Sequence, residues 1–253
     1  MAPKKQKKFA RNTTVDAEEI RQFDELGEKW WDESGPMRPL HQLNPVRLDY
    51  IRRMIRERFS LPDRIKCLQS LKIADIGCGG GLVTEPLRRM GAEVTGVDAG
   101  RENIRIAKAH AKTHHLDIEY LATTAEKLAA SGKKYDVVTA LEIVEHVADV
   151  DIFLKAICKL VAPGGMLIMS TLNRTPKSYL LGIVAAEYVL RWLPAGTHDW
   201  KKFLKPSELA RGLEKNGLQI TDVRGLIYNP FSRDFSLSKS DLDVNYLLTA
   251  TKP

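Results

Sequence analysis

Long apolar segments are missing from this 253-residue chain. It has no run of about 18 apolar residues, the length that a membrane-spanning helix needs. Residues 1–10 are basic, but no apolar stretch follows them, which disfavours a secretory signal. With 43% hydrophobic and 28% charged residues, the composition predicts a soluble globular protein.

Cysteine is also scarce. Cys67, Cys78 and Cys158 are far apart, and no two of them form a CxxC pair. This spacing indicates neither a disulfide framework nor a cysteine-based zinc site. We therefore expect a reducing compartment.

Acidic residues are absent before Asp16, whereas five basic residues lie there: Lys4, Lys5, Lys7, Lys8 and Arg11. These five account for most of the formal net charge of +7. The basic character therefore belongs to a tail, and we expect no nucleic-acid partner. Residues 1–13 are predicted to be a disordered, solvated tail, with contact to anionic lipid headgroups as the functional alternative.

A short apolar stretch that ends in closely spaced glycines organises the rest of the chain. Residues 73–81 read Ile-Ala-Asp-Ile-Gly-Cys-Gly-Gly-Gly, the pattern of a buried strand that turns sharply into a ligand-binding loop. Glycine tolerates positive φ and has no Cβ, so Gly77 and Gly79 let the backbone approach a ligand closely. Alone, the loop is compatible with nicotinamide, flavin and adenosyl-sulfonium cofactors.

From residue 71, short β-rich runs alternate with helical stretches, which is typical of βαβ units around a parallel sheet. The predicted strands are 71–76, 93–97, 117–121, 135–140, 166–171, 219–226 and 244–251. The predicted helices between them are 82–90, 101–113, 125–130, 150–161 and 206–216.

The segment before the glycine loop is predicted to be helical. Helix 14–31 is opened by Asp16, with Glu19 three residues later in the spacing of a capping box. A second helix, 44–59, is expected to begin at Asn44-Pro45, because proline is favoured in a first helical turn.

Asp98 follows the strand 93–97 and lies 21 residues after Gly77. A carboxylate at this place can accept hydrogen bonds from both hydroxyls of an adenosine ribose. Capping of the next helix is compatible with the same role. The glycine loop and Asp98 together therefore favour a nucleoside ligand.

The glycine loop, Asp98, the segment Tyr135-Asp136-Val137-Val138 and the turn Pro163-Gly164-Gly165 stand in the order of class I S-adenosylmethionine-dependent methyltransferases, which the chain resembles. Seven further segments make it similar to the ubiquinone-biosynthesis O-methyltransferase family over nearly all of residues 14–250. They are Trp30-Trp31-Asp32, Pro39-Leu40-His41, Asn44-Pro45-Val46-Arg47-Leu48, Glu142-Ile143-Val144-Glu145-His146, Ser170-Thr171-Leu172-Asn173-Arg174, Gly196-Thr197-His198-Asp199 and Asp243-Val244-Asn245-Tyr246.

The resemblance implies one Rossmann-like α/β domain over residues 14–253, with a mostly parallel seven-stranded sheet that contains one antiparallel strand. Within it we expect an N-terminal helical cap (14–65), a cofactor-binding core (71–172), a helical membrane or lid insert (173–204) and a C-terminal part of the sheet (205–253). It also implies O-methylation of catechol hydroxyls on polyprenylated ubiquinone precursors, in both O-methylation steps, with S-adenosylmethionine as cosubstrate and Mg²⁺ as cofactor.

Carried over by the same resemblance, the cofactor contacts fall on Arg47, Gly77, Asp98 and Leu141, and the glycine loop adds Gly79. Relatives often have methionine at position 141. Leucine keeps an apolar wall for the adenine, so this departure is compatible with cofactor binding.

Glu142, Glu145 and His146 are the candidate catalytic and metal-binding residues. Their spacings of three and four would bring all three together on one helical turn, where they could hold a divalent cation that lowers the pKa of a catechol hydroxyl. Imidazole is a softer ligand than Mg²⁺ prefers, so His146 is alternatively the general base. A structural role is the third interpretation, and His198 is a second candidate base.

The insert contains an apolar run, 178–193, in which only Glu187 and Arg191 are charged. A helix of this length is too short to span a bilayer. With the basic residues around it, it predicts peripheral contact with anionic lipids of the inner membrane, from the cytoplasm or the mitochondrial matrix. A buried lid is the alternative. Other ubiquinone-biosynthesis proteins are possible partners.

Three rival functions remain open at this stage. One is a related methyltransferase that acts on a soluble phenol. The other two belong to different classes: a nicotinamide-dependent oxidoreductase and a non-catalytic nucleoside-binding module.

Overall fold

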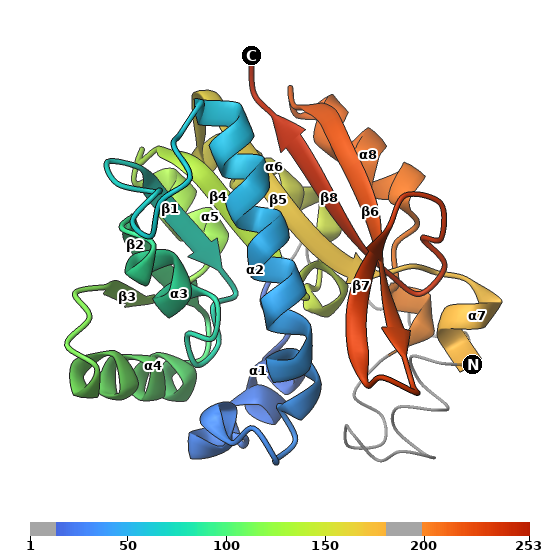
Figure 1. The fold of residues 1–253 in the computed structure, drawn as a ribbon, viewed down its shortest axis with the longest axis horizontal. Coiled ribbons are helices and arrows are strands. Elements are labelled where there is room, and N and C mark those ends of the chain that lie inside the picture. Colours follow the sequence, from blue (N-terminus) through green and yellow to red (C-terminus); the bar gives the residue numbers. More distant parts are fainter. Residues whose placement is uncertain (1–13, 181–198) are drawn as a thin grey trace, which may run out of the picture.

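A central sheet organises residues 14–180 and 199–253, the part of the chain that this computed structural model describes (Figure 1). Its strands are β1 (Lys72–Ile76), β2 (Glu93–Asp98), β3 (Glu119–Ala122), β4 (Tyr135–Leu141), β5 (Val161–Leu172), β6 (Gln219–Asn229), β7 (Asp234–Ser238) and β8 (Asn245–Thr251). They lie in the order β3-β2-β1-β4-β5-β8-β6-β7. Strands β1 to β5 are parallel, whereas β8 runs antiparallel to both β5 and β6.

The expected fold class, a Rossmann-like sheet that is mostly parallel, is confirmed. The expected count of seven strands is wrong, because the described residues form eight. The additional strand, β7, pairs antiparallel with β6. Only two of its side chains, Phe235 and Leu237, alternate onto the core beneath α2, and so short a pattern gave no clear strand signal. Among the other seven strands, β8 is the antiparallel one that the family resemblance implied.

Helices cover both faces of the sheet (Figure 1). On one face lies α2 (Arg38–Phe59), which packs Tyr50, Ile51 and Ile55 into the same cluster as Ile73 of β1. On the other face lie α5 (Ala125–Ala130), α6 (Val150–Leu160) and α8 (Pro206–Lys215), whose cluster includes Ala74. Neighbouring residues of one strand thus enter opposite cores, as the two-residue period of a strand requires.

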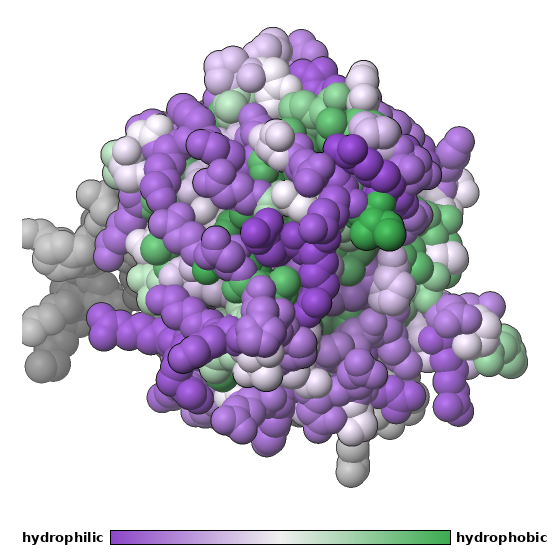
Figure 2. All heavy atoms as spheres, turned by 60° about the vertical axis from the view of Figure 1, so that its left-hand side comes forward, coloured by the Kyte–Doolittle hydropathy of each residue, from purple (hydrophilic) through white to green (hydrophobic). Residues whose placement is uncertain are grey.

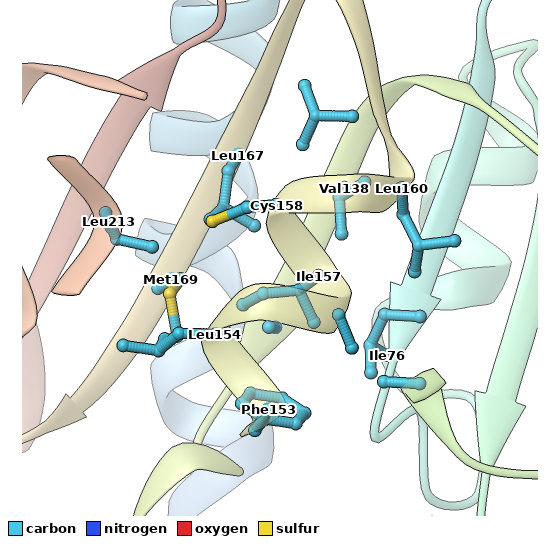
Figure 3. Close-up of a cluster of buried hydrophobic side chains, with 14 of the residues drawn as sticks. Ile76, Val138, Phe153, Leu154, Ile157, Cys158, Leu160, Leu167, Met169 and Leu213 are labelled. Atoms are coloured by element: carbon cyan, nitrogen blue, oxygen red, sulfur yellow. The ribbon is translucent and has the colours of Figure 1, made fainter. Parts of the chain in front are cut away.

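The second core is centred on α6. In Figure 3, Phe153, Leu154 and Ile157 project from this helix toward the sheet, where Leu167 and Met169 of β5 meet them. All five are almost completely buried. This packing fixes α6 against β5.

The N-terminal helices differ in their bounds from the prediction. The first helix is divided into α1 (Ala17–Asp24) and the 3₁₀ helix η1 (Gly27–Trp31), whose first residue, Gly27, has φ +53°. The second begins at Arg38 and not at Asn44. Pro39 occupies its first turn and Pro45 lies inside it, so the proline signal was assigned to the wrong proline.

Helices α3 (Thr84–Arg89) and α4 (Arg101–Thr113) lie close to their predicted positions. The short helix α7 (Pro176–Ser178) and the 3₁₀ helices η2 (Val144–His146) and η4 (Trp200–Lys202) were not predicted as such. The predicted tail 1–13 and nearly all of the predicted helix 178–193 lie outside the described residues. In the described part of the chain, no helix combines the length and apolarity needed to cross a bilayer.

Candidate active site

A cavity of about 760 Å³ lies under the N-terminal helices, at the edge of the sheet where β1, β2 and β4 end. Ligands of open α/β sheets bind at this edge. Seven of the predicted site residues line the cavity: Arg47, Gly77, Gly79, Asp98, Leu141, Glu142 and His146. Glu145 is not part of the lining, since its side chain is buried behind the wall.

The glycine loop after β1 depends on the absence of side chains. Gly77 has φ +75°, and a Cβ placed there would lie 2.2 Å from Ile143 Cδ1. Gly79 has φ +52°, and its Cβ would lie 2.4 Å from the Trp30 ring. Both positions therefore combine a left-handed backbone with a close neighbour that leaves no room for a methyl group.

Asp98, at the end of β2, is held by the loops on both sides of it. The backbone N–H groups of Gly79 and Gly100 donate to its two carboxylate oxygens, at 3.0 and 2.8 Å. Asn103 Nδ2 donates to Oδ1 at 3.2 Å, and Asn103 Oδ1 in turn accepts from Trp30 Nε1 at 2.9 Å. Burial raises the pKa of Asp98, and these hydrogen bonds oppose that rise.

Arg47 is a buried cation in the cavity wall, and only 3% of its surface is exposed. Its Nη2 donates to Asn44 Oδ1, while its Nε is buried without a hydrogen-bond partner among the described residues. Burial lowers the pKa of Arg47, and the carboxylates of Glu142 and Asp75 oppose this. A carboxylate-bearing ligand would satisfy both the charge and the unpartnered N–H.

Glu142 follows β4 in a left-handed conformation, with φ +50°. Its carboxylate accepts from Ser170 Oγ at 2.6 Å and from Asn245 Nδ2 at 3.1 and 3.2 Å. Residues from the ends of β5 and β8 therefore fix its orientation at the cavity wall.

Glu145 lies beside this group and is only 3% exposed. Thr171 Oγ1 donates to its Oε2 at 2.8 Å, whereas Oε1 is buried with no hydrogen-bond partner in the described part of the chain. Burial, and then the charge of Glu142, raises the pKa of Glu145. A buried carboxylate oxygen without a partner, next to a second carboxylate, is a donor set that suits a hard cation.

His146 is hydrogen-bonded to α1, a segment distant in the sequence, which is in turn tied to η4. Glu19 Oε2, from α1, lies 2.9 Å from His146 Nδ1, and Lys202 Nζ, from η4, lies 2.7 Å from Glu19 Oε1. The Phe23 ring packs edge-on against the His146 ring, with the two ring centroids 5.1 Å apart. Burial disfavours the charged imidazole, but the hydrogen bond to Glu19 and the nearby carboxylates outweigh it and raise the pKa of His146.

The predicted helical turn through Glu142, Glu145 and His146 is wrong. The backbone of Glu142 has a left-handed conformation, and residues 144–146 form the 3₁₀ helix η2. The three side chains therefore do not share one face of an α-helical turn. In residues 14–180 and 199–253, three ligand atoms within 4.8 Å of one another are found in a different group, Glu85, His110 and His114.

Three contributors to the site gave weak signals in the sequence. Glu19 was assigned to a capping box, but Asp16 caps α1 by itself, and its carboxylate accepts from the Glu18 N–H at 3.1 Å. Asn245 stood in a family segment without an assigned role. Lys202 was interpreted only as one of the basic residues around the insert, and His198 lies outside the described residues.

Comparisons with known proteins agree with this geometry. A family model described as "Methyltransferase domain" matches residues 47–223. A relative from Nitrobacter winogradskyi named "Ubiquinone biosynthesis O-methyltransferase" is 52% identical over 242 residues, which are 95% of this chain and 92% of the relative. A relative of the same name from Brucella anthropi is 50% identical over 242 residues, 95% of this chain and 97% of the relative.

Among solved structures, magnesium protoporphyrin IX methyltransferase from Synechocystis PCC 6803 with bound SAH matches with a TM-score of 0.61. The sequence identity is 20%, and the match covers 86% of each chain. At this identity the likeness shows the fold alone, that of a class I methyltransferase.

Proposed function

The chain belongs to the family of ubiquinone biosynthesis O-methyltransferases, and from this premise we propose that it methylates a catechol-type hydroxyl of a polyprenylated ubiquinone precursor. The methyl donor is S-adenosylmethionine. We extend the proposal to both O-methylation steps of the pathway. The observation that carries it is one cavity that joins the glycine loop and Asp98 to Glu142 and His146.

The cofactor is held by residues at the ends of β1, β2 and β4. Asp98 accepts hydrogen bonds from the ribose hydroxyls, and Leu141 forms an apolar wall for the adenine. The buried Arg47 pairs with the carboxylate of the methionine moiety, which supplies the partner that its Nε lacks. These contacts fix the sulfonium so that its methyl carbon faces the acceptor.

The transfer itself is an in-line displacement. The acceptor oxygen forms a bond to the methyl carbon while the bond from carbon to sulfur breaks, and the sulfur leaves as the neutral thioether of S-adenosylhomocysteine. The hydroxyl proton passes to His146. Because Glu19 accepts from Nδ1 of that ring, we assign Nε2 as the nitrogen that receives the proton.

As the alternative to His146 acting as the base, we propose that Glu142, Glu145 and His146 would hold Mg²⁺ or a similar divalent cation. The unpartnered Oε1 of Glu145, buried beside the charge of Glu142, supports this through its donor chemistry. Such an ion would lower the pKa of a bound catechol hydroxyl and orient both ring oxygens. Ser170 and Asn245 keep the Glu142 carboxylate turned toward that position.

We propose that the insert contacts anionic lipid at the membrane surface, where a polyprenylated substrate resides, on the inner membrane's cytoplasmic or matrix side. The apolar run 178–193 supports this, as do its first described side chains, because Tyr179 and Leu180 are 51% and 58% exposed. Vesicle flotation of the wild type and of Leu180→Glu tests it, with Lys215→Glu as the matched control. Equal flotation of all three proteins would reject this part.

The decisive experiment follows product formation by mass spectrometry with catechols that carry short or long isoprenoid chains. We expect S-adenosylhomocysteine and an O-methyl ether in equal amounts, with turnover that rises with chain length. Turnover that is indifferent to the chain would favour a soluble phenol as substrate. Cofactor binding without turnover of any catechol would contradict the proposed reaction.

A further inference from the structure

A second group of metal-ligating side chains lies outside the cavity described above. Glu85 belongs to α3, and His110 and His114 are four residues apart on α4 and at its C-terminal cap. One carboxylate oxygen and one ring nitrogen from each histidine all lie within 4.8 Å of one another. None of the three residues lines the cofactor cavity.

From this group we propose a binding site for a transition-metal ion of the zinc class, held by His110, His114 and Glu85. Two imidazoles and one carboxylate suit Zn²⁺, Co²⁺ or Ni²⁺ better than Mg²⁺, which prefers oxygen ligands. Tetrahedral zinc with bonds of 2.0–2.1 Å needs ligand atoms about 3.4 Å apart. Glu85 Oε1 and His110 Nδ1 are 2.7 Å apart and therefore have to separate slightly, while rotation of the exposed His114 side chain brings its nitrogen to the same spacing.

The hydrogen bonds of the two histidines prepare them as ligands. His114 Nδ1 lies 2.9 Å from the His110 carbonyl oxygen, which only accepts, so this nitrogen donates. In the neutral ring, Nε2 of His114 then carries the lone pair. Metal-binding histidines are commonly oriented by such a bond from the second nitrogen to a backbone carbonyl.

Glu85 gives the site a buried negative charge. Its side chain is only 2% exposed, and Oε1 lies 2.7 Å from His110 Nδ1. Metal binding exchanges the proton between these two atoms for the ion. The opposite oxygen, Oε2, faces Arg89 at 3.5 Å, so this arginine balances part of the charge without occupying the metal position.

The site is connected to the cofactor loop through Trp31. The Trp31 ring stacks on the His110 ring, with centroids 3.5 Å apart and an interplanar angle of 6°. The same indole donates from Nε1 to the Gly80 carbonyl at 3.0 Å. An ion that fixes His110 therefore also fixes the helix η1 over the glycine loop.

This surface is polar and reachable by a hydrated ion. Figure 2 turns the side of the molecule that carries α3 and α4 forward, and hydrophilic side chains predominate there while apolar ones form small, separate spots. His114 is exposed and His110 is partly exposed, so an ion enters from solvent past His114. The chemistry thus fits a free metal ion and not an apolar partner.

The test is calorimetric titration of tag-free protein with Zn²⁺, together with visible spectra of the Co²⁺ form. The wild type is expected to bind one ion at this site and to give the spectrum of a four-coordinate Co²⁺ centre. His114→Ala should weaken that binding by at least about tenfold, because loss of even a residue that only orients a ligand costs 10–100-fold. The matched control is His115→Ala, which changes the adjacent exposed histidine outside the group.

Coupling to the cofactor loop gives a second measurement. S-adenosylhomocysteine should bind more tightly when Zn²⁺ is present, and Zn²⁺ should bind more tightly by the same factor when S-adenosylhomocysteine is present, about fivefold at the low end of usual coupling. His114→Ala should keep its metal-free affinity for S-adenosylhomocysteine, which shows that it is folded.

Three results would overturn the proposal: no Zn²⁺ binding by the wild type, equal binding by His114→Ala and His115→Ala, or binding that only Glu145→Gln removes. The last result would move the ion to the reaction centre. Failure of methyl transfer would leave the metal titration unaffected, so the two proposals are tested separately.

Discussion

The two halves of the cavity are built in different ways. The half that we assign to the cofactor consists of the glycine loop and Asp98. It is fixed by backbone conformation and by N–H groups 19 and 2 positions from Asp98. The half that we assign to the acceptor contains Glu142 and His146, with Glu145 buried behind its wall. It is fixed by side chains from remote segments, with Glu19 127 positions before His146 and Asn245 103 positions after Glu142.

The difference separates binding from turnover. A change in the cofactor half alters the shape of a rigid loop and should act on affinity for the cofactor. A change in the acceptor half alters the orientation of an acid or a base and should act on kcat. The predictions below test whether this division holds, from the largest expected effect to the smallest.

Replacement of His146 by alanine should have the largest effect. Loss of a general base typically lowers the rate by about 10²–10⁴-fold, and we expect a fall in kcat of this size. Calorimetry should show unchanged affinity for S-adenosylhomocysteine. A simultaneous loss of affinity for S-adenosylhomocysteine would contradict the separation of cofactor binding from turnover.

Gly77→Ala should affect the other half. A left-handed backbone costs a non-glycine residue roughly 1–2 kcal/mol, and an overpacked contact costs about 1–3 kcal/mol more. The loop can relieve this strain only by moving out of the cofactor-binding conformation, and S-adenosylhomocysteine should therefore bind on the order of 100-fold more weakly. The control is Gly132→Ala, which has a positive φ of 81° but nothing within 4 Å of the added Cβ, and its affinity should equal that of the wild type.

Glu19→Gln tests whether the N-terminal helix α1 orients His146. Removal of a carboxylate that orients a functional histidine commonly costs 10–100-fold, so kcat should fall by about tenfold or more with cofactor affinity retained. Glu18→Gln is the control, because this neighbouring side chain is 77% exposed. Equal kinetics of the two variants would show that Glu19 does not act on His146, whereas partial recovery in Glu19→Asp would support orientation.

Lys202→Met should have the smallest effect. Its ion pair with Glu19 is partly exposed, and such pairs are worth about 0.2–1 kcal/mol, so kcat should fall by no more than about fivefold. Lys201→Met, the adjacent exposed lysine, should be neutral. A salt titration of kcat should reduce the gap between wild type and Lys202→Met, because ions screen this pair.

The cofactor half could be predicted from the sequence because its signals are local. The spacing of Gly77, Gly79 and Asp98 reflects a turn and a strand end, and each of these residues does line the cavity. The helix 101–113 after Asp98 was also predicted at its observed bounds. Local backbone chemistry decides all of these features.

The acceptor half could be predicted only in its residue types. The helical turn expected at residues 142–146 fails because Glu142 adopts a left-handed conformation that non-glycine residues rarely enter, and its bonds to Ser170 and Asn245 accompany that conformation. The contact of Glu19 with His146 depends on how α1 folds back over the sheet. Sequence periodicity contains no information about such a contact.

The position of Asn245 in the last strand has a consequence for the order of synthesis. Residues 30–141, which include the glycine loop, Asp98 and their supporting tryptophan, leave the ribosome about one hundred residues before β8 does. Because a domain generally folds as a unit, the single sheet is complete only when β8 has been added between β5 and β6. The contact that orients Glu142 therefore forms among the last in the life of a newly made chain.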